Sequence, residues 1–150
     1  MSSDSTEYRP TEEEKRSKEW QRDSNKRKMN EAEKNINSLD QKMKRLKEAK
    51  KVLETENSSF KNMMRTIDNS DMKIIHRWSG NQHEKVYKGT VKDFVSYYSN
   101  TRNQAVNQAL DSLNWAIQDV QSQINKQWGI FGEAKSLFES ALTWLANWFN

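Results

Sequence analysis

The stretch that decides the fold is MNEAEKNINSLDQKMKRLKEAKKVLETENSSFKNMMRTI, residues 29–67, because its apolar residues recur at alternating intervals of three and four. A seven-residue repeat held over this length predicts a long helix with a left-handed coiled-coil seam. Lys50 and Asn57 interrupt the seam, either to fix its register against one partner or as tolerated polar residues near water. The predicted seam positions are Met29, Ala32, Ile36, Leu39, Met43, Leu46, Lys50, Leu53, Asn57, Phe60, Met64 and Ile67.

Upstream of the seam, the sequence predicts a disordered tail over residues 1–10 and a helix start directly after it. Thr11 and Glu14 have the spacing of a capping box, in which each side chain bonds the other residue's amide. Residues 11–28 lack apolar seam residues apart from Trp20, so this part is expected to be exposed helix or to fray.

A turn is predicted near residues 78–81. Trp78-Ser79-Gly80 follows the first helix, and Asn81 and Glu84 have the spacing of a second capping box. Gly80 tolerates the backbone conformation that a reversal needs, and Trp78 fills the gap between the splaying helices. Residues 11–127 are therefore expected to form an elongated antiparallel helical hairpin.

The second helix is expected to run to about Gln127 with an eleven-residue period, close to that of a straight helix. We expect the first helix's Ile36, Leu39, Met43, Leu46 and Leu53 to pair either with this helix or with a partner helix. On the second helix, the pairing residues would be Phe94, Ala105, Leu113 and Ile124. The recurring residues are Tyr87, Tyr98, Ala109 and Val120, and Phe94, Ala105 and Ala116, flanked by Val91, Leu113 and Ile124.

The segment Trp128-Gly-Ile-Phe-Gly132 is predicted to break the second helix, leaving a shorter C-terminal amphipathic helix over residues 133–149. This helix must bury its apolar face on the hairpin, on a partner helix bundle or in a membrane interface. Lys135 is the only cation in the segment, which disfavours the membrane. The apolar face comprises Ala134, Leu137, Phe138, Ala141, Leu142, Leu145, Trp148 and Phe149.

The composition favours an all-α binding protein over an enzyme. Charged residues make up 31% of the chain and hydrophobic residues 33%, and there is no Cys. Basic and acidic side chains are interspersed, which disfavours a nucleic-acid partner. His76 and His83 flank the predicted turn with Glu84 adjacent, but no further His offers a convergent set of ligands, and no nucleophile or phosphate-binding motif occurs. We therefore expect no catalytic residue, metal or cofactor.

The hairpin with Trp78-Ser-Gly80 resembles the WXG family of small helical secretion substrates. Its length and closing amphipathic helix are more similar to the small helical proteins that accompany LXG-domain toxins in the type VII secretion systems of Gram-positive bacteria. That resemblance implies a non-enzymatic adaptor or targeting chaperone that binds a toxin's LXG domain, with a second small helical protein as a further partner. It also implies a cytoplasmic protein before export, secreted with its partner. No Tyr or Phe is followed four residues later by Asp, the family's common export signal, so that signal is assigned to the partner.

Two alternatives remain open, a self-assembling structural coiled coil and a membrane-active amphipathic helical protein. Under the favoured hypothesis, Trp78 and Gly80 form the turn and a set of apolar residues contacts the partner. That set is Ile36, Leu39, Met43, Leu46, Leu53, Phe94, Leu137, Phe138, Leu142, Leu145, Trp148 and Phe149.

Overall fold

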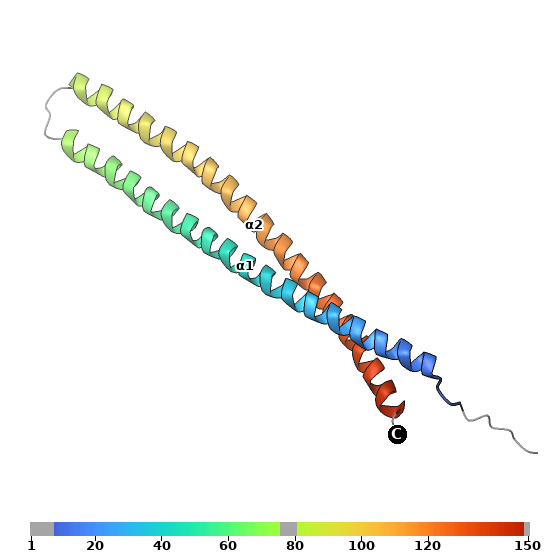
Figure 1. Ribbon diagram of the computed structural model, residues 1–150. Helices are drawn as coiled ribbons and strands as arrows, with labels where there is room; N and C mark the ends of the chain where they lie inside the picture. Colours follow the sequence, from blue (N-terminus) through green and yellow to red (C-terminus); the bar gives the residue numbers. More distant parts are fainter. Residues whose placement is uncertain (1–7, 76–80, 149–150) are drawn as a thin grey trace, which may run out of the picture. The chain divides into compact units, whose positions relative to one another are not determined.

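The computed structural model describes residues 8–75 and 81–148, without the side chains of 69–88 and 91. Over this part the chain is all-α and contains no strand, as the sequence predicts. Helix α1 runs from Glu12 to Ile75 and α2 from Asn81 to Trp148 (Figure 1). The predicted turn residues Trp78 and Gly80 lie outside the described residues, as do the side chain of Phe149 and most of the predicted tail.

The predicted capping box at the start of α1 is present. The backbone amide of Thr11 donates to Glu14 Oε2 at 2.8 Å, and the Glu14 amide donates to Thr11 Oγ1 at 3.2 Å. Tyr8 adds a hydroxyl that donates to Glu14 Oε1 at 2.5 Å. These bonds to the charged carboxylate lower the pKa of Glu14, with the Tyr8 bond as the largest cause. The cap satisfies amides that the first helical turn leaves without partners.

The predicted seam of α1 is confirmed by burial. Ala32, Ile36, Met43 and Met64 are buried, and the other seam positions are half-buried, except Ile67, which is exposed. Lys50 and Asn57 are also half-buried, so both polar interruptions lie in the seam and not beside it. The apolar repeat therefore determines which face of α1 is covered.

The chain forms two compact units, in each of which a segment of α1 packs against a segment of α2. The first joins residues 8–42 with 120–148, and the second spans Met43–Asp119. In the first unit, Asn35 Nδ2 donates to Gln127 Oε1 at 3.4 Å and Lys15 Nζ lies 6.0 Å from the Trp148 ring centroid. In the second, the Arg102 guanidinium lies 4.1 Å from the Phe60 ring centroid. In the first unit, Lys15 near the start of α1 lies beside Trp148 at the end of α2, and the later Asn35 bonds to the earlier Gln127. The two helix segments of this unit therefore run antiparallel.

The covered face of α2 follows a seven-residue repeat, not the predicted eleven-residue one. From Ser99 to Trp148, fifteen residues spaced alternately by four and three are all buried or half-buried. The predicted face is wrong at Phe94, Tyr98 and Ala105, which are exposed, whereas Val120 and Ile124 are buried. The covered residues are Ser99, Asn103, Val106, Leu110, Leu113, Ile117, Val120, Ile124, Gln127, Phe131, Ala134, Phe138, Ala141, Leu145 and Trp148.

The predicted break at Trp128–Gly132 is also wrong, because α2 continues through it to Trp148. The segment predicted as a separate helix over 133–149 is the last part of α2. The seam stays in phase across the two glycines through Gln127, Phe131 and Ala134, so packing outweighs their low helix propensity. No glycine among the described residues has a positive φ.

This continuity yields a first prediction. Gly129→Ala and Gly132→Ala should each raise the free energy of unfolding by about 1 kcal/mol, the difference in helix propensity. A Cβ at either position meets nothing within 4 Å, so no clash opposes the gain. Chemical denaturation followed by circular dichroism measures the change. A clear loss of stability in either variant would instead support an interruption of α2 at residues 128–132.

Candidate partner-binding surface

The structure divides the predicted partner-binding residues into covered and exposed groups. Ile36 and Met43 are buried, and Leu39, Leu46 and Leu53 are half-buried, all on the face of α1 that packs on α2 within the chain. On α2, Leu145 is buried, and Phe138 and Trp148 are half-buried in the seam. Phe94, Leu137 and Leu142 are the members that remain exposed.

In the first unit, the two sides of the seam differ in chemistry. The seam of α1 continues upstream of Met29 through Lys15, Lys18, Arg22 and Asn25, which are buried or half-buried. The last part of α2 covers them with aromatic and aliphatic side chains. Residues 11–28 are therefore neither exposed throughout nor frayed, although Trp20 itself is 70% exposed.

Two of these polar seam residues, Arg22 and Asn25, bond to neighbouring residues on α1. Asn25 Nδ2 donates to the Gln21 carbonyl oxygen at 2.7 Å. Arg22 Nε donates to Asp23 Oδ1 at 2.8 Å, and this bond lowers the pKa of the Asp23 carboxyl. Lysine and arginine can cover apolar surface with their alkyl stems while their charged ends reach water. Upstream of Met29, α1 thus supplies little apolar surface of its own to the seam.

Beside this seam, α2 carries a second apolar line, which we call the C-terminal flank: Ile130, Leu137 and Trp144, spaced by seven residues. Ile130 is 38% exposed and Leu137 is 50% exposed, whereas Trp144 is half-buried and stacks on Trp148 with ring centroids 5.6 Å apart. Apolar residues at the seam positions and at one flank give a face wider than a two-helix seam, which is typical of helices in larger bundles.

A groove lies at this flank, between the helices of the first unit. Asn25 and Lys28 line it from α1, and Ile130, Glu133, Ala134 and Leu137 line it from α2. Its apolar lining belongs to α2, and α1 contributes an amide and an ammonium group. A third helix laid in the groove would cover Ile130 and Leu137 and leave the polar groups at its margin.

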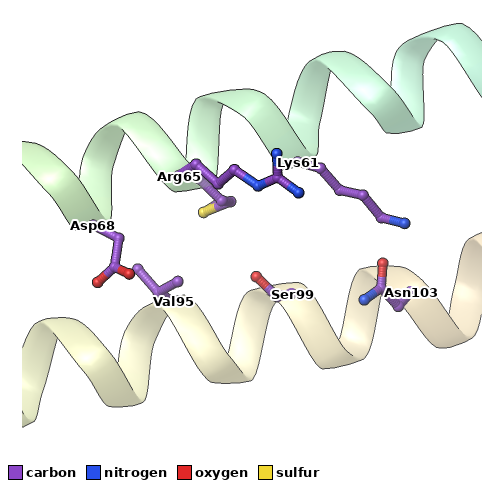
Figure 2. A pocket seen from close by; sticks show the side chains of 7 residues that line it. Lys61, Arg65, Asp68, Val95, Ser99 and Asn103 are labelled. Carbon is purple, nitrogen blue, oxygen red and sulfur yellow. The ribbon is translucent and has the colours of Figure 1, made fainter.

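A second groove lies within the other unit, where α2 places Ser99 and Asn103 at its seam positions. Figure 2 shows these two small polar side chains and Val95 facing Lys61, Arg65 and Asp68 across a space between the helices; Met64 completes the lining. The half-buried Asn57 and Arg102 each have one buried polar atom without a hydrogen-bond partner, Oδ1 and Nε respectively. The seam is more polar here than around Val120 and Ile124, so packing stabilises this part of the second unit less.

Ile130 and Trp144 are not among the partner-binding residues that the sequence predicts. The seam of α2, once it is followed through the glycines, identifies both, because each directly precedes the seam residues Phe131 and Leu145. Trp128, which the sequence places in a helix break, lies within α2 and is 53% exposed. Its ring packs edge-on against Phe131, with ring centroids 5.6 Å apart.

Among the described residues, no group of three metal-ligating side chains occurs, and no helix is both long and apolar enough to cross a membrane. No curated protein and no solved structure matches the chain. A family model described as YwqH-like matches residues 21–138, which include most of both helices and the C-terminal flank up to Leu137. The chain therefore belongs to the YwqH-like family.

Proposed function

We propose that the protein is a non-enzymatic helical adaptor that binds the helical LXG domain of a type VII secretion toxin and promotes its export. The observation that carries the proposal is the apolar face at the end of α2, which is wider than the polar α1 segment opposite it can cover. Membership of the YwqH-like family supports a role within the group of small helical proteins that the sequence resembles.

Helix binding is the function that this face suits best. An amphipathic helix recognises a groove through side chains spaced by three, four and seven residues. Ile130 and Leu137, one heptad apart, offer such a helix two contacts about 10 Å apart along the α2 axis. The partner would need aliphatic residues at matching spacing and an acidic group near Lys28. In this proposal the protein is cytoplasmic before export and leaves with its partner.

Binding of a cognate LXG domain tests the proposal. The domain should co-purify with the full chain on size exclusion and raise its melting midpoint, because it binds the folded state. If the wild-type chain forms no complex with the domain, the proposed function is wrong.

Leu137→Arg should weaken the complex at least tenfold by replacing an apolar contact of the groove with a charged side chain, while changing the melting midpoint of the free chain little. Val52→Arg is the matched control, since Val52 is also an exposed aliphatic residue, 60% exposed, but lies on α1. Isothermal titration calorimetry compares the three chains. Equal affinities for all three would place the binding surface elsewhere.

A further inference from the structure

The outward side of α2 in the second unit carries a line of residues that its packing with α1 does not use. We call it the outer stripe: Phe94, Tyr98, Thr101, Ala105, Gln108, Ser112 and Trp115. The spacing alternates between four and three, and all seven residues are exposed. The line therefore forms a second heptad face, which α1 does not cover.

The outer stripe ends in aromatic residues that contact water. Trp115 is 73% exposed, and Phe94 and Tyr98 are each 48% exposed. Tyr97, 67% exposed, lies beside the stripe and meets Tyr98 edge-on with ring centroids 5.7 Å apart. Phe94 and Tyr98 are themselves 4.5 Å apart between centroids. Exposed tyrosine and tryptophan are enriched among the residues that dominate protein interfaces.

Charge is depleted around the outer stripe. Between residues 94 and 119 the charged residues are Arg102, Asp111 and Asp119, and none belongs to the stripe. The α1 segment of the same unit is densely charged, with basic pairs at 44–45 and 50–51. Solvent-exposed helix faces usually carry lysine and glutamate, whereas the centres of protein interfaces are depleted in charged residues.

The two ends and the centre of the outer stripe carry the same kinds of residue in either direction. Aromatic residues occupy its two ends, and the small Ala105 lies at its middle. If two copies pair antiparallel about Ala105, Phe94 and Tyr98 of each copy meet residues 112–115 of the other. The small Ala105 then lets the two backbones approach closely at the centre. We propose that the outer stripe binds the outer stripe of a second copy of this chain, forming a closed dimer with two-fold symmetry.

The area is sufficient for such a dimer. An aromatic side chain buries 150–250 Å² when fully covered, so the exposed parts of these four aromatic residues offer roughly 500 Å² per copy. A stable interface needs about 800 Å² per partner, which the intervening residues and their neighbours can complete. Both copies use the same surface, so the pair is closed.

Sedimentation velocity of the full chain, without any partner protein, tests the dimer. The wild type should be dimeric at micromolar concentration, and Trp115→Ala should raise the dissociation constant at least tenfold, because the dimer loses the side chain twice. Trp20→Ala is the matched control: Trp20 is 70% exposed on α1 and should leave the constant unchanged. A wild type that stays monomeric at 100-fold higher concentration, or a Trp115→Ala dimer as tight as the wild type, would overturn the proposal.

Disulfide trapping tests the antiparallel register, since the chain has no cysteine of its own. Ala105→Cys should form an intermolecular disulfide under mild oxidation, because residue 105 of each copy lies at the symmetry axis. Ser122→Cys, also exposed on the outward side of α2, should not, because an antiparallel pair places it far from its counterpart. Equal trapping of both would indicate a parallel pair, and no trapping of Ala105→Cys would exclude this interface. Since neither experiment includes a toxin domain, either can fail while the proposed function stands.

Discussion

Replacing Ile36 by alanine is expected to lower the free energy of unfolding by about 2–4 kcal/mol. Ile36 is 3% exposed and lies in the α1 seam of the first unit. The truncation removes three carbons from a packed site and leaves a cavity that neighbouring side chains fill only in part. The change is large relative to the roughly 5–15 kcal/mol by which a domain is usually stable.

Leu137→Ala is the matched control for that measurement. It removes a comparable side chain from a residue that is 50% exposed, so the loss should stay below about 1 kcal/mol. Denaturant titration followed by circular dichroism gives both values, provided that the denaturant dependence is the same in both variants. If the two variants lose similar stability, Ile36 is not part of the core and the seam assignment fails.

The seam of α1 is the element that the sequence predicts best. Its repeat is carried by residues such as Ile36, Leu39, Met43 and Leu46, with charged residues between them, so the apolar and polar faces separate clearly. The capping box at Thr11 and Glu14 is equally readable, because it depends on residues only three apart. Local signals of this kind need no knowledge of the partner helix.

The seam of α2 is harder to recognise because few charged residues mark its outward face between residues 94 and 119. Phe94, Tyr98 and Trp115 are as apolar as the covered Val106 and Leu113, so a second period fits the sequence about as well as the correct one. The true seam also passes through Ser99, Asn103 and Gln127, which composition alone assigns to the surface. Distinguishing the two faces requires the pairing with α1, which is a tertiary property.

The helix break predicted at Gly129 and Gly132 is wrong for a different reason. Each costs about 1 kcal/mol of helix propensity, which is a breaking signal when a segment is considered alone. Here Ile124, Ala134, Ala141 and Leu145 are buried on either side. Burial of these flanking residues outweighs the local cost in helix propensity. Ile130 and Leu137 can be placed on one line of exposed residues only when the helix continues through the glycines.

Removing residues 133–150 is expected to unfold the first part of α1, although that part is distant in sequence. Residues 15–25 have Lys15, Lys18, Arg22 and Asn25 in their seam, so they cannot cover a helix partner with apolar groups of their own. Their order depends on contacts with the end of α2, such as Lys15 with Trp148. An isolated helical segment of this length is marginal in water, so the amides of residues 12–28 should lose most of their protection.

Hydrogen exchange measured by mass spectrometry follows those amides directly, and residues 43–68 in the second unit act as an internal reference that should stay protected. Leu145→Asp in the full chain should reproduce the loss, because Leu145 is 4% exposed and a buried carboxylate there opposes packing. Leu142→Asp should not, because Leu142 is 41% exposed and its carboxylate would stay hydrated. If residues 12–28 stay protected in both the truncated chain and Leu145→Asp, the prediction is wrong. In that case the cap and helix propensity alone stabilise this part of α1, and the end of α2 is free to bind elsewhere.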